Sequence, residues 1–402
     1  MLVTPSLLHV KTRTGRSQQE DAVALRSQLR SSAPMPDGLT ADQVLSRLDA
    51  PVLRIGAERT EWDCVRDDHA AMAANGEWAD LLEALRYTDQ ERVMASGGHR
   101  VAPLISEGMR ARLSVAIAAG DWTAARSELA VLESLYDRNQ DDYCAAQVLA
   151  QGHIDLARAR RMTVPEGQMS RGILAEAAAH YDRAEALVTE FDPIEEMSPL
   201  LAATRYALLS GIEDGGAVCR EWYEDWVDLD PEDAQAHAAH AVDMLPGWHG
   251  SLEGFEREAR RAVRMTQGVT GRAAYAIYHI TAVKVLGDLS PTVDLEYFCE
   301  AIADYQSATG CQHRANIAAH LLANLALDYR KGGAETAWQL TKVRAALSDV
   351  LWNRLREVQM DCWTKGPEIL AFAMAEIFGP ALKRGARIVR RGEGLGTLVR
   401  RT

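Results

Sequence analysis

Residues 103–136, PLISEGMRARLSVAIAAGDWTAARSELAVLESLY, carry the clearest structural pattern in the chain. On each side of the pair Gly120-Asp121, apolar residues recur at steps of three and four positions, which places them on one face of an α-helix. Glycine favours the left-handed backbone that ends a helix, and aspartate caps the helix that follows. The stretch therefore predicts two antiparallel helices, Pro103–Gly120 and Trp122–Tyr136. Their apolar faces are Ile105, Met109, Leu113, Ala116 and Ile117, then Trp122, Ala125, Leu129, Leu132 and Tyr136.

The same hairpin pattern recurs along most of the chain. Short breaks at Asn75-Gly76, Gly215-Gly216, Gly287-Asp288 and Gly332-Gly333 separate further helical stretches. The chain has only five phenylalanines and almost no Val/Ile/Thr-rich runs bounded by turns, so little in it matches a strand. We predict an all-α fold, an α-solenoid of roughly seven antiparallel helix hairpins stacked on one another.

Composition excludes several classes of protein. The 402 residues carry a net charge of −13, and the six cysteines are scattered without a C-x-x-C pair, so neither a zinc ribbon nor a thioredoxin-type redox pair is indicated. No apolar run approaches the ~20 residues of a membrane span. The first residues lack the charge-then-apolar order of a signal peptide. Isolated thiols fit a reducing compartment, and we predict a cytoplasmic protein.

Three segments are expected. Residues 1–59 are rich in Ser, Gln, Arg and Pro and are predicted to form an N-terminal arm or capping helices, with helices near Gln18–Ser31 and Ala41–Leu48. Residues 60–382 are predicted to be the helical repeat domain. Residues 383–402 form a basic C-terminal tail.

One unit resembles a known family. Leu200–Asp233 spans 34 residues and ends in Leu229-Asp-Pro-Glu-Asp233, so it resembles a tetratricopeptide repeat in its period and its Pro-terminated second helix. Ala207 and Cys219 match the small positions of the repeat, and Tyr223 matches an aromatic one, whereas Trp226 departs from the pattern. The Gly-Glu-Trp and Gly-Asp-Trp turns at 76 and 120 lie 44 residues apart, so the array is irregular. The resemblance implies a degenerate tetratricopeptide-like repeat protein that binds other proteins.

The candidate partner surface is acidic and aromatic. Residues 213–233 contain nine acidic residues and one basic residue, Arg220, interleaved with aromatic side chains. Such a surface suits a basic peptide or partner helix, although a solvated face of an amphipathic helix would have the same composition. The turn Pro246-Gly-Trp-His-Gly250 interrupts the repeat, and loops of this kind often carry function. The candidate contact residues are Trp222, Tyr223, Glu224, Asp225, Asp228, Trp248 and His249.

Two alternatives remain open. His237 and His240 lie three positions apart on an expected helix, and with His249 they would line an inter-helix pocket of a small-molecule- or metal-binding enzyme. The C-terminal tail carries a local net charge of +6 and would contact phosphate or an anionic membrane. It has no aromatic residue for base stacking, so nucleic acid is not the expected partner. The basic tail residues are Lys383, Arg384, Arg387, Arg390 and Arg391.

No recognised catalytic motif is present. The chain lacks G-x-x-x-x-G-K-[ST], H-E-x-x-H and G-x-S-x-G, so no catalytic residue, metal ligand or cofactor is predicted. The leading hypothesis is a non-enzymatic scaffold or adaptor that binds a peptide or partner helix on its concave face, with a basic partner matching the acidic stretch best.

Overall fold

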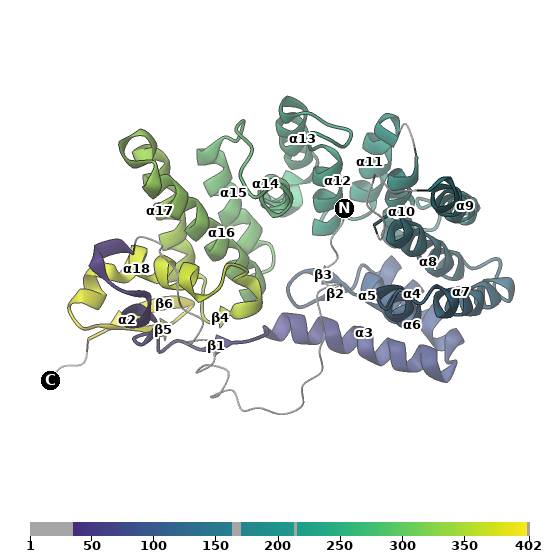
Figure 1. Ribbon diagram of the computed structural model, residues 1–402, viewed down its shortest axis with the longest axis horizontal. Helices are drawn as coiled ribbons and strands as arrows, with labels where there is room; N and C mark the ends of the chain where they lie inside the picture. Colours follow the sequence, from purple (N-terminus) through teal and green to yellow (C-terminus); the bar gives the residue numbers. More distant parts are fainter. Residues whose placement is uncertain (1–34, 163–169, 213–214, 400–402) are drawn as a thin grey trace. The chain divides into compact units, whose positions relative to one another are not determined.

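The computed structural model describes residues 35–162, 170–212 and 215–399 (Figure 1). In these residues the chain is mostly helical, with seventeen α-helices and six short strands that pair two by two. The prediction of an all-α protein is confirmed at this level. Among the described helices, none combines the length and the apolar character that a membrane crossing requires. The helix expected near Gln18–Ser31 lies outside the described residues.

The described chain forms two compact units. The first unit contains residues 61–269, and the second contains residues 35–60 together with residues 270–399. The second unit thus combines the described part of the predicted N-terminal segment with the described part of the predicted basic tail.

The first unit is built from helices that pack mainly on their sequence neighbours. Helices two apart also touch, as α8 and α10 do, and α4 reaches across to α8. Its elements are α3 (Ala57–Asn75, of which residues 57–60 belong to the second unit), α4 (Trp78–Gln90), β2 (Met94–Ala95), β3 (His99–Arg100), α5 (Val101–Met109), α6 (Ala111–Ala118), α7 (Trp122–Asp137), α8 (Tyr143–Met162), α9 (Arg171–Val188), α10 (Pro199–Ala207), α11 (Cys219–Leu229), α12 (Ala234–Asp243) and α13 (Leu252–Thr270).

The predicted turn at Gly120-Asp121 is confirmed. Gly120 has a positive φ of 68°, and the Asp121 side chain accepts hydrogen bonds from the amides of Thr123 and Ala124 at the start of α7. On α7 the predicted apolar face is buried at Ala125, Leu129, Leu132 and Tyr136, and Trp122 is partly buried. Local chemistry is sufficient to place this turn and the start of α7.

The single helix predicted over Pro103–Gly120 is wrong. Two helices, α5 and α6, meet at Arg110, whose φ and ψ of −101° and 8° leave the helical range. The Arg110 side chain is buried, and its guanidinium donates to the carbonyl oxygen of Ser106 at 2.7 Å and to Asp155 at 3.1 Å. The break therefore coincides with a contact to α8, 45 positions away in the sequence.

The second unit also pairs consecutive helices, and α15 with α17 and α16 with α18 are in contact. Gly287, at φ 89°, caps α14 in the left-handed conformation, as the Gly287-Asp288 break predicts. Its elements are α2 (Ala41–Leu45), β1 (Val52–Leu53), α14 (Ala273–Leu286), α15 (Leu295–Ser307), α16 (Gln312–Lys331), α17 (Ala337–Asn353), β4 (Val358–Gln359), α18 (Pro367–Lys383), β5 (Arg387–Arg391) and β6 (Gly394–Leu398), with a short 3₁₀ turn, η7, at Met360–Cys362.

The two ends of the described chain pack together in this unit. In Figure 1 the purple segment with α2 and β1 lies beside the yellow segment with α18, β5 and β6. Strand β1 pairs in parallel with β4, so that Val52 faces Val358, and Leu48 forms a β-bridge with Ile388. Helix α2 begins at Ala41 as predicted but ends at Leu45.

The described part of the basic tail is folded. Strands β5 and β6 form an antiparallel hairpin that turns at Gly392, which has a φ of 61°. Ile388 and Leu395 are buried, and this burial gives the hairpin an apolar face against the helices. Residues 387–398 of the basic tail are therefore part of the folded second unit.

Candidate functional site

The described part of the acidic-aromatic stretch, residues 215–233, forms a short 3₁₀ turn at Gly215–Ala217, α11 and the turn into α12. Tyr223 is fully buried and Trp226 nearly so, because helical periodicity directs both toward α12 and the core. Tyr223 stacks on His240, with ring centroids 4.0 Å apart. The Tyr223 side chain, a predicted partner contact, is therefore not accessible from the surface. Trp222 is half-buried beneath the Arg205 guanidinium, which lies 5.7 Å from the ring centroid.

Arginines of neighbouring helices neutralise part of the acidic surface. Glu224 pairs with Arg261 of α13, and Asp225 pairs with Arg205 of α10. Asp228 and Glu221 are exposed and form no ion pair within the described part of the chain. The negative charge available to a partner on α11 is thus concentrated at Glu221 and Asp228.

The Pro246–Gly250 turn is fixed by its own backbone. The amide of Trp248 donates to the Leu245 carbonyl at 3.2 Å, and the amide of His249 donates to the Asp243 carbonyl at 2.9 Å. A Cβ atom on Gly250 would lie 1.9 Å from the Met244 carbonyl oxygen, so only glycine fits there. Trp248 and His249 are exposed, and Trp248 keeps 40% of its surface. The loop is thus a rigid support for an exposed tryptophan.

The loop lies against the turn that leads into α11. Cβ atoms built on Gly215 and Gly216 would lie 3.4 Å from the His249 side chain. The residues before α11 and the Trp248 loop, about 30 positions apart in the sequence, are therefore neighbours in the first unit.

A buried polar cluster lies beneath α11. The Tyr206 hydroxyl is 3.0 Å from Nδ1 of His240, 3.1 Å from Sγ of Cys219 and 2.8 Å from Oδ2 of Asp243. Burial raises the pKa of Cys219 to about 12, so its thiol stays protonated and is a poor nucleophile. Burial also lowers the pKa of His240. The cluster joins α10, α11 and α12 through buried polar contacts.

Glu258 of α13 connects this network to Arg220 on the surface of α11. Burial acts to raise its pKa, but hydrogen bonds from His240 and Arg220 outweigh burial and lower the pKa to about 2. The carboxylate therefore stays ionised and holds the exposed Arg220 side chain at 2.6 Å.

The three histidines of the alternative site are not brought together. His237 Nδ1 contacts the Tyr223 hydroxyl at 2.8 Å, His240 belongs to the Tyr206 network, and His249 is exposed on the loop. In the described residues, the one set of three His, Cys, Asp or Glu side chains whose ligand atoms lie within 4.8 Å of one another is His313, Asp361 and Cys362.

This second cluster belongs to the second unit. His313 is the second residue of α16, whereas Asp361 and Cys362 lie in η7, so the segment after α17 brings them together. Nδ1 of His313 is 3.4 Å from Sγ of Cys362. Cys362 is buried, His313 is half-buried and Asp361 is exposed, so the cluster opens to solvent on the Asp361 side.

A buried hydrogen-bond network fixes these residues. Oδ1 of Asn316 accepts from Nε1 of Trp363 and from the amide of Gln359, each at 2.9 Å, and its Nδ2 donates to the Glu357 carbonyl at 3.0 Å. Oε1 of Gln312 accepts from the Arg356 amide at 2.7 Å. Both side chains project from the first turns of α16, so they join this helix to the segment that carries η7.

Glu58 caps the same end of α16. Its Oε1 accepts from the amides of Gln312 and His313 at 2.8 and 3.2 Å, and its Oε2 accepts from Nε2 of Gln359 at 2.8 Å. Burial acts to raise the pKa of Glu58, but these hydrogen bonds outweigh burial and lower it. An ionised carboxylate at a helix N-terminus also interacts favourably with the helix dipole.

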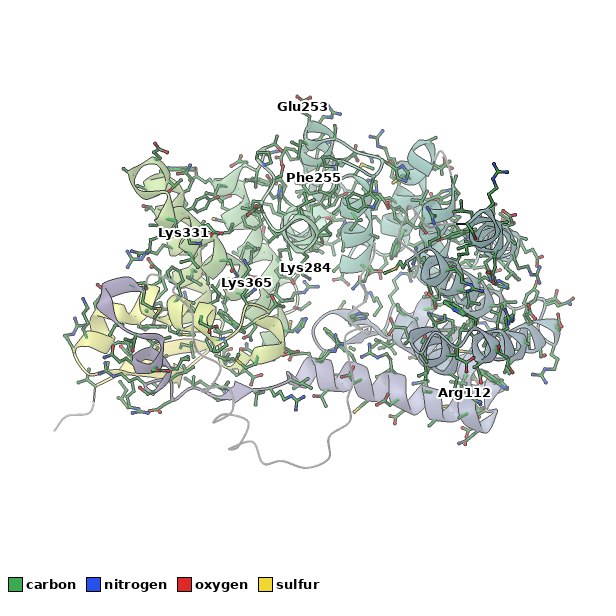
Figure 2. All side chains as sticks on the ribbon, viewed as in Figure 1. Arg112, Glu253, Phe255, Lys284, Lys331 and Lys365 are labelled. Carbon is green, nitrogen blue, oxygen red and sulfur yellow. The ribbon has the colours of Figure 1, made fainter. Side chains whose placement is uncertain are left out.

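Burial and nearby cations both affect the pKa values of the cluster. Burial lowers the pKa of His313 to about 4 and raises the pKa of the Cys362 thiol. Lys284 of α14, labelled in Figure 2, is close enough to Cys362 and His313 to affect both, and its own pKa is lowered by desolvation. Arg59, in the first turn of α3, also contributes to the lowered pKa of His313 through its positive charge.

The sequence carries no signal for this cluster. His313 and Cys362 are 49 positions apart and belong to no known metal-binding spacing. Sequence reasoning therefore missed it and predicted no metal ligand.

The basic tail residues are partly occupied by internal ion pairs. Arg387 pairs with Asp49, and Lys383 lies 3.3 Å from Asp37. Arg384, Arg390 and Arg391 are exposed and form no ion pair within residues 35–399 as described.

In comparisons with known proteins, no family model, no curated protein and no solved structure matches this chain.

Proposed function

We propose that the chain is a non-enzymatic scaffold, a degenerate tetratricopeptide-like solenoid, which binds a basic peptide segment where the Pro246–Gly250 loop meets the turn before α11. Trp248 is the observation that carries this proposal. It is a large aromatic side chain, 40% exposed, on a loop whose backbone is already ordered. Tryptophan is enriched among the residues that dominate binding energy, and an ordered loop loses little entropy on binding.

Charge supports a basic partner. Residues 213–233 contain nine acidic residues against one arginine, and Glu221 and Asp228 on α11 have no internal ion pair among the described residues. Lysine or arginine side chains would pair with these carboxylates, and one of them would rest on the Trp248 ring through a cation–π contact. The chain's net charge of −13 would accelerate the approach of such a segment.

The arrangement of helices supports the repeat assignment. Consecutive helices pack on one another, and helices two apart, such as α8 with α10 and α16 with α18, are also in contact. Stacked helix hairpins produce both kinds of contact. The 34-residue unit at Leu200–Asp233 corresponds to α10 and α11, and the cap at Asp233 begins the next helix. The step from this architecture to partner binding is an analogy between folds.

A reducing compartment such as the cytoplasm is part of the proposal. The six cysteines are all free, and Cys144, Cys219 and Cys362 are buried without a disulfide partner.

The experiment is a selection from a random 12-residue peptide library displayed on phage, with wild-type chain and Trp248→Ala as parallel baits. We expect wild-type to enrich peptides with clustered Lys or Arg, and Trp248→Ala to lose that enrichment. Trp338→Ala is the matched control, because Trp338 on α17 is 54% exposed and lies outside the proposed surface. Equal enrichment by wild-type and Trp248→Ala, or no enrichment of basic peptides, would overturn the proposal.

A further inference from the structure

We propose that His313, Asp361 and Cys362 bind one divalent metal ion of the zinc type. This site lies in the second unit and is independent of the proposed partner surface, so either can fail without the other. The argument rests on the spacing of the three ligand atoms, on their chemistry and on the network that holds them.

The spacing of the donors fits tetrahedral coordination. With Zn–N of about 2.05 Å and Zn–S of about 2.3 Å, tetrahedral angles place the two donors about 3.5 Å apart. The observed distance from Nδ1 of His313 to Sγ of Cys362 is 3.4 Å. All three ligand atoms lie within 4.8 Å of one another, and Asp361 is exposed, so a small rotation of its side chain would complete the set.

The donor atoms select the kind of metal. An imidazole nitrogen, a thiolate and a carboxylate together suit a borderline ion such as Zn²⁺, whereas Mg²⁺ and Ca²⁺ prefer all-oxygen sites. Three protein ligands leave the fourth tetrahedral position for water. On the exposed Asp361 side this position faces solvent, which also gives the ion a path of entry.

The surroundings hold together the two segments that carry the ligands. Asn316 and Gln312 bind the backbone just before Asp361 and Cys362 and join it to α16, and Glu58 caps the helix at the His313 amide. A buried network with this many hydrogen bonds would keep the donors in place before an ion arrives.

The charged groups around the three ligands are of both signs. Glu58 and Asp361 are acidic, whereas Lys284 and Arg59 are basic. Metal binding would displace the proton of the Cys362 thiol to the solvent. The +2 charge of Zn²⁺ would then balance the two negative charges of its own ligands, the Asp361 carboxylate and the Cys362 thiolate.

The experiment measures metal on the untagged full-length chain. After treatment with EDTA, the chain is titrated with Zn²⁺ in competition with a chromophoric chelator, and bound zinc is counted by mass spectrometry. We expect one zinc per chain, and an affinity at least about 100-fold weaker in Cys362→Ser and His313→Gln. When Co²⁺ is bound in place of Zn²⁺, wild-type should show thiolate-to-cobalt charge-transfer absorption. Cys362→Ser should lack this absorption.

Two matched controls lie in the same unit. His320→Gln removes another half-buried histidine of α16, and Cys299→Ser removes another half-buried cysteine, so both should bind zinc as wild-type does. Asp361→Asn changes an exposed side chain and should weaken binding without loss of helical circular dichroism. The proposal is overturned if wild-type binds no zinc, or if Cys362→Ser and Asp361→Asn both bind it with unchanged affinity.

Discussion

Nδ1 of His313 lies 3.4 Å from Sγ of Cys362, although 49 positions separate the two residues in the sequence. Three side chains create this proximity: Gln312 and Asn316, which bind the backbone of residues 356–359, and Glu58, which caps α16.

Asn316→Ala should destabilise the chain by at least about 3 kcal/mol. Asn316 is fully buried, and its loss would leave the Trp363 indole, the Gln359 amide and the Glu357 carbonyl without their partner, at about 1–3 kcal/mol for each unsatisfied group. The measurement is the free energy of unfolding in urea. Asn324→Ala is the control on the same helix, because its Nδ2 bonds mainly to the His320 carbonyl one turn away, and it should cost at most about 1 kcal/mol. Equal effects of the two substitutions would contradict this account.

Gly56→Ala should also destabilise the second unit, by about 1–3 kcal/mol. An added Cβ would lie 2.2 Å from Oε1 of Gln359, so the Gln359 side chain must move and lose its hydrogen bond to Glu58.

The control for Gly56 is Gly268→Ala on α13, where an added Cβ has no atom within 4 Å. Alanine in a helix is favoured over glycine, so this change should stabilise the chain by about 0.5–1 kcal/mol. Thermal unfolding of both variants shows whether each substitution raises or lowers the stability of the chain. A rise in stability for Gly56→Ala would show that Gln359 is not held in place.

Asp89 should make the stability of the chain depend on pH. Burial raises its pKa to about 6, although it accepts hydrogen bonds from the Leu200 amide at 2.9 Å and the Tyr143 hydroxyl at 3.1 Å. In the unfolded chain an aspartate has a pKa of about 4, so between pH 4 and pH 6 the folded chain retains a proton that the unfolded chain releases. The contribution of Asp89 is therefore present at low pH and is lost as the pH rises through about 6.

The test is a comparison of wild-type with Asp89→Asn. The free energy of unfolding of wild-type, minus that of Asp89→Asn, should fall by about 2 kcal/mol between pH 4 and pH 7. Taking this difference cancels the titration of the other groups. A difference that does not change with pH, or that grows as the pH rises, would show that the Asp89 pKa is not raised.

Local chemistry explains which parts of the fold are predictable from the sequence. The turn at Gly120-Asp121 and the cap at Gly287 follow from residue types at the turn itself, and both occur where expected. The break at Arg110 was missed because it accompanies a contact to Asp155, 45 positions away. Strands β1 and β4 are two residues long, too short to show an alternating pattern, and they pair across about 300 positions.

The candidate site residues also differ in whether local sequence or tertiary packing decides their position. The exposure of Trp248 agrees with a loop between glycines, whereas Tyr223 was assigned to a surface although the helical pattern also allowed it to face inward, and it is buried. His313, Asp361 and Cys362 come together only through the packing of α16 against the segment after α17. Their spacing in the sequence therefore does not predict a shared site.

The most direct test of the proposed function is hydrogen–deuterium exchange of the chain with and without a basic peptide selected on wild-type. The account predicts slower exchange of backbone amides in residues 215–229 and 246–250, with exchange in residues 337–353 unchanged. Protection confined to the second unit, or no protection at a saturating peptide concentration, would contradict the claim that the Trp248 loop and α11 form the partner-binding surface.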